Sequence, residues 1–318
     1  MQNFLDFEKP LLEIQTKIEE LRHLKDDSIN IANELASLQD DFDKKLKDIY
    51  TSLSPWQKVK ICRHQDRPKF QDFVENIFDE FISLSGDRLY SEDFSLKGGI
   101  ASINEYSCLV LGNDKGKDID SRVKNNFGMA KPEGYRKAIR LMNLAEKFKL
   151  PVICFIDTPG AFPGVDAEDR GQSEAIANSI QISLELQTPM QSFIVGEGGS
   201  GGAIALATAN EVIMLEHAIY SVISPEGCAT ILWKDIDFSD KAAESLCLTA
   251  QDLEKLGVID GIIVEPLGGA HRNIQEVCKS IKVRVIGFLD SFKTKSGKDI
   301  VMQRKEKFLK IGREFIEN

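Results

Sequence analysis

The chain has 318 residues, a formal net charge of −10, 42% hydrophobic residues and 28% charged residues. This length and composition allow a large buried core, and the acidic balance argues against general affinity for nucleic acid or acidic membranes. The start MQNFLDFEKPLLE is acidic where a secretory signal is basic, and no apolar run is long enough to span a bilayer. We therefore expect a soluble, cytoplasmic protein.

The cysteines are widely separated and form no C-x-x-C pair. We therefore expect no metal site built from neighbouring thiolates on this chain. Buried, reduced thiols are favoured over disulfides in a chain of this size without a secretory signal. The six cysteines are Cys62, Cys108, Cys154, Cys228, Cys247 and Cys278.

Residues 1–65 are interpreted as an N-terminal helical extension. Up to about residue 50, apolar side chains recur at helical spacing, which predicts two amphipathic helices with a break at Asp26-Asp27-Ser28. We expect these helices to pack on the main domain or on a partner chain. Residues 67–84, RPKFQDFVENIFDEFISL, predict a further helix.

Residues 66–292 are interpreted as the main domain. Two strands come first, KGGIASI and YSCLVLG, separated by a turn at Asn104-Glu105. Helices and short apolar strands then alternate, which indicates parallel pairing and an α/β fold. The elements in chain order are helix GYRKAIRLMNLAEKF, strand PVICFIDTPG, helix DRGQSEAIANSIQISLELQ, strand SFIVGEGG and a helix opening with AIALATAN.

The remaining elements continue this pattern. Strands VIML and AIYSVIS precede a turn and helix at SPEGCATILW, a capped helix TAQDLEKLG, a strand in GVIDGIIVE and a long helix in HRNIQEVCKSIKVRVIGFLDSF. Residues 293–318 predict a C-terminal helical tail. Because loops at the carboxyl ends of parallel strands carry the chemistry of such sheets, DTPGAFPG and GEGGSGGA are the candidate functional segments.

The segment GEGGSGGA, residues 196–203, has three possible chemical interpretations. The first is nucleotide binding, because Gly196, Gly198 and Gly201 satisfy G-x-G-x-x-G and Glu216 follows about twenty residues later. That fingerprint normally opens its domain, however, and here at least two strands and two helices precede it. The match is therefore a weak indication.

The second interpretation is a serine hydrolase. Residues 198–202 also satisfy G-x-S-x-G around Ser200, and His271 lies downstream with several acids between them. His271 stands near an expected helix start, where an imidazole can equally be a cap or a packed side chain.

The third interpretation needs no side chain. Backbone N–H groups at a helix N-terminus can bind a developing negative oxygen, and glycine lets that oxygen approach without a Cβ in the way. The alternative without chemistry is that the glycines allow a helix to pack closely on a strand.

Two neighbouring segments bear on this choice. Asp157 in DTPGAFPG could be a base or a metal ligand, although the prolines favour a rigid wall. Residues 122–140 hold six basic residues and one acid. Such a run is either a solvated helix face or a site for a phosphate-bearing ligand or an acidic partner.

Five longer segments resemble the α chain of bacterial-type acetyl-CoA carboxylase carboxyltransferase. They are NNFGMAKPEGYRKAIRLM, FIDTPGAFPGVDAEDRGQSEAIA, VGEGGSGGAIAL, YSVISPEGCATILWK and EPLGGAHRN. The resemblance covers nearly the whole chain and is weakest between about residues 22 and 50. It implies a crotonase-like fold of repeated strand-strand-helix units.

The resemblance also implies a reaction and partners. The family transfers a carboxyl group from carboxybiotin, held on the biotin carboxyl carrier protein, to acetyl-CoA and gives malonyl-CoA, the first committed step of fatty acid synthesis. Two α and two β chains form the transferase, which works with biotin carboxylase. In the family, zinc belongs to the β chain. A noncatalytic scaffold subunit remains the alternative.

Site residues follow from the resemblance. The backbone amides of Gly201 and Gly202 would bind the ureido oxygen of biotin, with Gly198 and Gly199 shaping the approach. The other substrate-binding candidates are Ala203, Gly160, Phe162, Arg136 and Lys137. Phe162 stands where many relatives have tyrosine, so a hydroxyl there is not expected to be essential.

Overall fold

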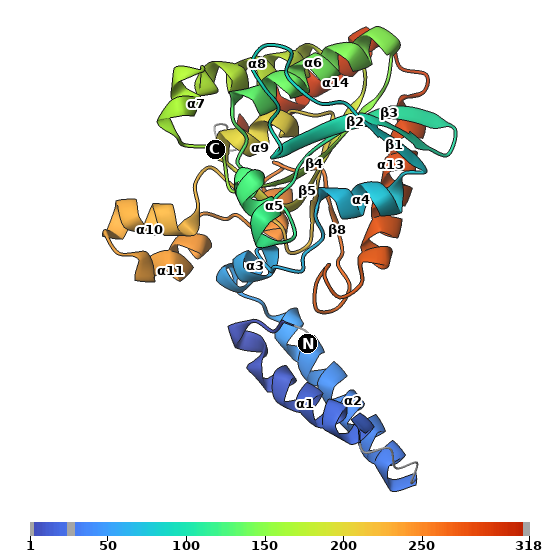
Figure 1. Cartoon of the computed structure of the whole chain (residues 1–318), viewed down its shortest axis with the longest axis vertical. Helices are drawn as coiled ribbons and strands as arrows, with labels where there is room; N and C mark the ends of the chain where they lie inside the picture. Colours follow the sequence, from blue (N-terminus) through green and yellow to red (C-terminus); the bar gives the residue numbers. More distant parts are fainter. Residues whose placement is uncertain (1–2, 24–28, 314–318) are drawn as a thin grey trace.

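The computed structural model describes residues 3–23 and 29–313, so the expected break at Asp26-Asp27-Ser28 lies outside the described residues. One mixed sheet forms the centre, in the order β1-β2-β3-β4-β5-β6-β8, with β7 paired to β5 beyond β6 (Figure 1). The strands are β1 Glu80–Ser83, β2 Leu96–Ile103, β3 Tyr106–Asn113, β4 Val152–Thr158, β5 Met190–Gly199, β6 Glu211–Leu215, β7 Ile219–Ser221 and β8 Gly261–Ile263.

The pairing directions divide the sheet in two. β1, β2 and β3 are antiparallel neighbours, with β2 and β3 joined at the expected turn, where Asn104 has a φ of +51°. From β3 onward every pair is parallel. The expected α/β class is confirmed, and the carboxyl ends of β3, β4 and β5 meet at one edge of the sheet.

Helices cover both faces. α6 Pro132–Phe148, α8 Gln172–Glu185 and α9 Ser200–Ala207 pack together on one face, and α14 Gly297–Lys310 contacts α8 (Figure 1). α4 Phe70–Ile77 and α13 Ile274–Phe292 pack together on the other face. The shorter helices are α5 Ile119–Lys124, α7 Val165–Asp169, α10 Pro225–Trp233, α11 Ser239–Ser245 and α12 Ala250–Lys255, with 3₁₀ turns at Asp6–Glu8, Asn126–Gly128 and Ile236–Phe238.

Aromatic rings join the sheet to its helices. Phe155 of β4 stacks on Phe73 of α4 at a centroid distance of 5.3 Å and on Phe193 of β5 at 5.6 Å. All three rings are fully buried. Because aromatic pairs at this spacing add to the free energy of burial, this stack helps to fix β4 and β5, the strands that carry both candidate segments.

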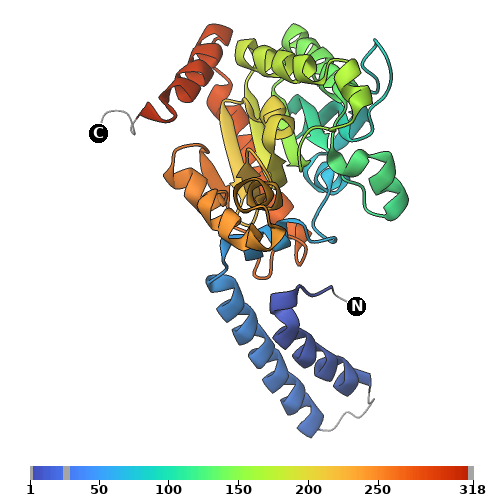
Figure 2. The same ribbon diagram turned by 90° about the vertical axis from the view of Figure 1, so that its left-hand side faces the viewer.

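The N-terminal helices pack on each other, rather than along the main domain. α1 Lys9–His23 and α2 Ile29–Thr51 form a hairpin that projects from the body (Figures 1 and 2). Its seam buries Leu11, Ile18 and Phe42. The base is anchored where Tyr50 meets the ring of His217 edge-on at 5.7 Å.

Two further features differ from or extend the sequence interpretation. The helix expected over residues 67–84 ends at Ile77, and Glu80–Ser83 form the edge strand β1. All six cysteines are free thiols, of which five are buried and Cys247 is exposed. Among the described helices, none combines the length and the hydropathy of a membrane span.

Candidate functional site

The two candidate segments meet at the carboxyl edge of the sheet. β5 runs directly into α9, and the loop after β4 lies against this junction. A Cβ on Gly199 would collide with the carbonyl oxygen of Pro159, and one on Gly202 would lie 2.7 Å from the carbonyl carbon of Gly160. These two glycines are therefore required because the two backbones are in contact.

Gly201 differs from its neighbours. A Cβ there would meet only Ile176 within the chain, at an ordinary van der Waals distance of 3.5 Å, and its φ lies outside the left-handed region. Packing within the described chain therefore does not require a glycine at this position. Gly201 is also partly exposed, whereas Gly202 is buried.

The N-terminus of α9 opens onto a groove. No side chain caps the helix at Gly199, so the first amides of α9 lack the usual side-chain acceptor. Ser200 is exposed and has a φ of +47°, which marks a sharp strand-to-helix turn. The groove has a volume of about 390 Å³ and is mainly apolar; it is lined by Ser200, Gly201, Ile204, Tyr220, Ser221, Val222, Leu246, Leu253 and Val258.

The other predicted loop residues lie at different depths. Gly198 and Ala203 are buried, so the Ala203 side chain contacts protein rather than the groove. Gly160 has a φ of +150°, and a Cβ added at this position would have no heavy atom within 4 Å. The ring of Phe162 lies under the ammonium group of Lys131, at 4.7 Å from its centroid.

The two predicted basic contacts are engaged within the chain. Lys137 is 1% exposed, forms an ion pair with Glu92 and donates to the carbonyl oxygen of Asp93 at 2.7 Å. Arg136 donates to the carbonyl oxygen of Arg170. Burial removes Lys137 from contact with a ligand, and the sequence alone could not distinguish it from an exposed lysine.

The hydrolase interpretation fails on geometry. The His271 ring stacks on His64 at 3.9 Å, and the groove beside Ser200 is lined by no histidine or carboxylate among the described residues. Burial, together with His64, Arg272 and Arg67, lowers the pKa of His271 to about 3. Ser200 thus has the strained turn of a nucleophile but no neighbouring base.

The nucleotide interpretation also loses its acidic residue. Glu216 accepts a hydrogen bond from the amide of Glu265 at 3.0 Å. Glu265 in turn forms a fully buried ion pair with Arg67 at 2.6 Å. Glu216 therefore helps to hold a structural ion pair in place.

Sequence reasoning missed a buried charge network beside the site. Lys115 binds Asp157 at 2.7 Å and Glu197 at 2.6 Å, and Arg63 binds Glu197 at 2.7 Å. Burial alone would raise the pKa of Asp157, but Lys115 and Lys69 lower it below its ordinary value. Asp157 is thus a paired carboxylate rather than a free base. Its position at a strand end was the one signal in the sequence.

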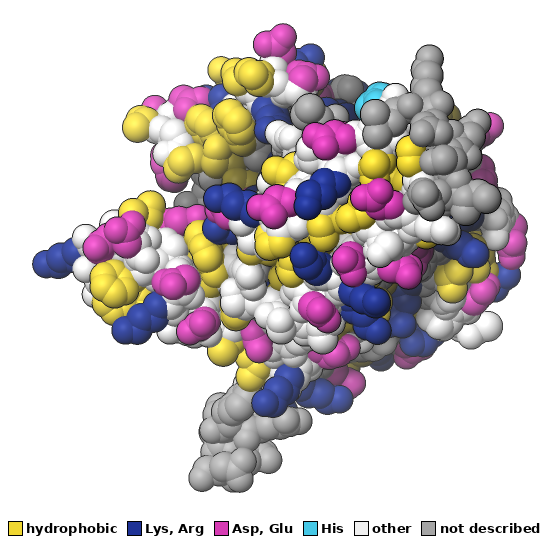
Figure 3. Space-filling model, turned by 90° about the horizontal axis from the view of Figure 1, so that it is seen from below, with side chains coloured by type: hydrophobic (Ala, Val, Ile, Leu, Met, Phe, Trp, Pro, Cys, Tyr) yellow, Lys and Arg dark blue, Asp and Glu magenta, His cyan; other side chains and the backbone are white. Residues whose placement is uncertain are grey.

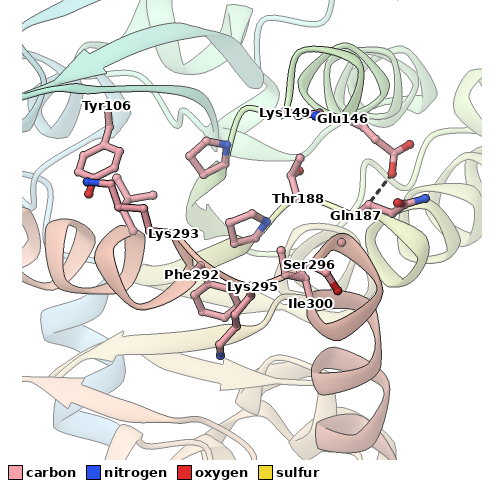
Figure 4. A pocket seen from close by; sticks show the side chains of 14 residues that line it. Tyr106, Glu146, Lys149, Gln187, Thr188, Phe292, Lys293, Lys295, Ser296 and Ile300 are labelled. Carbon is pink, nitrogen blue, oxygen red and sulfur yellow. Dashed lines mark hydrogen bonds between the residues drawn. The ribbon is translucent and has the colours of Figure 1, made fainter.

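Within the described chain, no group of three or more His, Cys, Asp or Glu side chains is arranged to hold a metal ion. A separate cavity lies at the opposite end of the strands. It measures about 770 Å³ and lies where Pro151 and Pro189 lead into β4 and β5. Figure 4 shows Lys149, Lys293 and Lys295 among the side chains around it, and Glu146 accepting from the amide of Gln187 at 2.8 Å. Because it is remote from both candidate segments, we do not assign it to the same site.

Solved structures share this fold. The chain superposes on transcarboxylase 12S with a TM-score of 0.60 and 17% identity, over 77% of this chain and 46% of that one. The β subunit of P. aeruginosa geranyl-CoA carboxylase superposes with a TM-score of 0.56 and 17% sequence identity, over 80% of this chain and 45% of that one. The chain thus spans about half the length of each. These proteins confirm the expected crotonase-like fold.

Sequence relatives are much closer. The "Acetyl-coenzyme A carboxylase carboxyl transferase subunit alpha" of Rhodospirillum centenum is 52% identical over 311 residues, covering 98% of both chains. That of Zymomonas mobilis is 51% identical over 312 residues, covering 98% of this chain and all of the relative. Residues 4–312 match the family described as "Acetyl co-enzyme A carboxylase carboxyltransferase-like". The chain therefore belongs to the acetyl-CoA carboxylase carboxyltransferase family, and its relatives are α subunits.

Proposed function

We propose that this chain is the α subunit of an acetyl-CoA carboxylase carboxyltransferase, moving a carboxyl group from carboxybiotin on a carrier protein to acetyl-CoA to give malonyl-CoA. Membership of the family supports the reaction. The observation that carries the site is Gly201, a partly exposed glycine that packing does not explain, at an uncapped helix start beside an open groove.

The chemistry needs dipoles rather than a titrating side chain. When the carboxyl group leaves biotin, negative charge collects on the ureido oxygen, and the resulting anion can take a proton from the acetyl methyl group. Amides at the start of α9, those of Gly201 and Gly202, would stabilise that charge. The groove beside Ser200 offers apolar walls for the ring system of biotin.

The rigid loop after β4 supports the same proposal. Gly160 and Phe162 lie on the segment that is held against the β5–α9 junction by the close contacts at Gly199 and Gly202. Gln172 donates to the carbonyl oxygens of Ala130 and Phe162 at 2.9 Å each and ties this loop to α8. We propose that this loop forms one wall of the biotin channel, preorganised before substrate arrives.

A second subunit would complete the site. Exposed hydrophobic side chains gather on the left of the molecule seen from below, including the lobe formed by α10 and α11 (Figure 3). On this lobe and near it, Val222, Ile231, Leu232, Ile236 and Phe238 are all at least 40% exposed. A group of neighbouring, exposed apolar side chains such as this one is typical of a protein–protein interface. We propose that it binds the β subunit, which would supply the acetyl-CoA site and the zinc ribbon.

The test is reconstitution. The chain is co-expressed with a β subunit of the same family, co-purified, and assayed for malonyl-CoA formation with carboxylated biotin on its carrier. We expect activity from the complex and none from either chain alone. A complex that forms but makes no malonyl-CoA would refute the proposal, and labelling of Ser200 by a fluorophosphonate would revive the hydrolase interpretation.

A further inference from the structure

A small cavity beside the candidate site is not used by the proposed chemistry. It measures about 200 Å³ and lies at the carboxyl ends of β3, β4 and β5. Four of its lining residues carry positive charge. The lining consists of Cys62, Arg63, Lys69, Lys115, Arg122, Phe127, Pro159 and Glu197.

Two of the four cations are balanced within the chain. Lys115 pairs with Asp157 and Glu197, while Arg63 pairs with Glu197 and Glu226. Arg122 donates weakly to the carbonyl oxygen of Gly116 at 3.5 Å. The four cations are Arg63, Lys69, Lys115 and Arg122, and the three carboxylates paired with them are Asp157, Glu197 and Glu226. This group of side chains therefore has one positive charge in excess.

Of the two lining cations for which no carboxylate partner is described, Lys69 and Arg122, Lys69 is the more buried. Lys69 follows α3 Pro55–Cys62 in the chain and immediately precedes α4, and the residue is 6% exposed. Within the described chain no hydrogen bond or ion pair ends on its ammonium group. Burial lowers the pKa of Lys69, and Lys115, Arg67 and Arg122 lower it further, while Asp157 opposes them. A buried ammonium group that has no hydrogen bond or ion pair of its own is costly, so an anion bound beside it would stabilise its charge.

The cavity is bordered by a strained turn. Asn126, Phe127 and Gly128 have φ values of +44°, +54° and +84°, three consecutive left-handed residues. The left-handed conformation costs a non-glycine residue roughly 1–2 kcal/mol. The turn holds the Phe127 ring, which is 51% exposed, at the cavity. Backbone strain of this kind gathers at ligand sites.

We infer that this cavity binds one oxyanion group of a substrate, a phosphate or a carboxylate, with Lys69 as its principal partner and Arg122 at its side. A water molecule takes up about 30 Å³ of liquid, so a cavity of about 200 Å³ admits such a group but not a whole coenzyme. Two sources fit this chemistry under the proposed function: a phosphate of the CoA moiety, or the carboxylate that is transferred.

The first experiment measures binding without turnover. The purified full chain is titrated with inorganic phosphate, in parallel with Lys69→Met, Lys69→Arg and Lys117→Met. Lys117 is the matched control, because it is an exposed lysine paired with Asp72 outside the cavity. We expect Lys69→Met to weaken phosphate binding at least tenfold, Lys69→Arg to retain most of it, and Lys117→Met to behave as wild type. A folded Lys69→Met chain that binds phosphate as tightly as wild type overturns the inference.

The second experiment identifies the source in the reconstituted complex. If the group is the 3′-phosphate of CoA, Lys69→Met raises KM for acetyl-CoA several-fold and leaves KM for 3′-dephospho-acetyl-CoA unchanged. If it is the transferred carboxylate, the variant raises KM for malonyl-CoA in the reverse reaction and not KM for acetyl-CoA. Unchanged KM values for all three overturn the substrate assignment. An inactive wild-type complex would count against the proposed function alone, because phosphate binding is measured separately.

Discussion

At the scale of single residues, the glycines of the β5–α9 junction divide into two kinds. Gly199 and Gly202 are explained by backbone contact with the loop after β4, since a Cβ would strike Pro159 or Gly160. Gly201 has room for a methyl group inside the chain. Its lack of a side chain is therefore best explained by something that approaches from outside.

This difference yields a paired prediction. We expect Gly201→Ala to fold at least as stably as wild type, because alanine is favoured over glycine within a helix by about 1 kcal/mol. We expect carboxyl transfer to fall by about 10², the order lost with one oxyanion donor, because the methyl group would block the approach. The measurements are urea unfolding of the chain and malonyl-CoA formation by the complex.

Two variants serve as controls for Gly201→Ala. Gly202→Ala should lose about 1–3 kcal/mol of unfolding free energy through overpacking against Gly160. Ser200→Ala should retain most activity, because the exposed hydroxyl has no base beside it in the groove. A Gly201→Ala complex with wild-type turnover would contradict the proposed role of this amide.

His271 gives a pH prediction at the same scale. Its pKa is about 3 in the folded chain, against about 6.5 when unfolded, so between these values the unfolded chain binds more protons. Stability should therefore fall as pH decreases from about 6.5 towards 3, by up to about 1.4 kcal/mol per pH unit from this residue. Above about pH 6.5 the contribution of His271 to the free energy of unfolding does not change with pH.

The test compares His271→Phe with wild type. Phenylalanine keeps a ring against His64 and removes two buried nitrogens that have no hydrogen-bond partner among the described residues. When the pH falls from 7.5 to 5, we expect the free energy of unfolding to decrease by about 2 kcal/mol less in the variant than in wild type. Urea unfolding at the two pH values measures this difference. Equal losses in the two proteins would show that His271 titrates normally.

At the scale of elements, α14 is fixed by one buried cation. Arg304 is fully buried and donates to the carbonyl oxygens of Ser183, Leu186 and Thr188 and to the side chain of Asn210. Burial lowers its pKa to about 10, so it stays charged at neutral pH. The helix expected in the tail thus joins the main body through the segment that connects α8 to β5.

We expect Arg304→Met to lose about 3–5 kcal/mol of unfolding free energy, because it leaves buried oxygens without their donor. Lys305→Met is the matched control on the exposed face of the same helix and should change stability by less than about 0.5 kcal/mol. Urea unfolding followed by circular dichroism measures both. Equal stability of the two variants would mean that α14 docks without Arg304.

Most elements could be predicted because their signals are local. The continuous apolar strands, the turn into a helix at SPEGCATILW and the capped helix TAQDLEKLG predict β4, β5, α10 and α12 close to their observed bounds. β1 was missed because its apolar residues continue the spacing of α4, and only pairing with β2 makes Glu80–Ser83 a strand. That pairing joins residues far apart in the chain.

The site was predictable only in part, for the same reason. The glycine segment and the loop after β4 can be read from sequence, and their order places them at one sheet edge. The ion-pair partners of Lys137 and Asp157 cannot be predicted from the sequence, because burial and ion pairing depend on the folded arrangement. Lys69 carries no local signal at all, since its environment comes from four separate segments.

At the scale of the whole molecule, the exposed hydrophobic side chains are distributed unevenly. Ile231 and Leu232 on α10 are 70% and 63% exposed, and this lobe stands apart from the sheet (Figure 1). The groove beside Gly201 also includes Val222 and Leu246, which flank the α10–α11 segment in sequence. A subunit bound to this lobe would therefore lie next to the proposed biotin site.

We expect Ile231→Asp to prevent assembly with the β subunit, because a desolvated carboxylate at an apolar contact is costly. The isolated chain should stay folded, since this side chain is 70% exposed. Val283→Asp on α13, away from the lobe, is the matched control at 66% exposure and should assemble normally. Light scattering of the co-expressed pairs measures assembly. If Ile231→Asp forms a complex of wild-type size and activity, the β subunit must bind elsewhere. In that case it would not complete the groove beside Gly201.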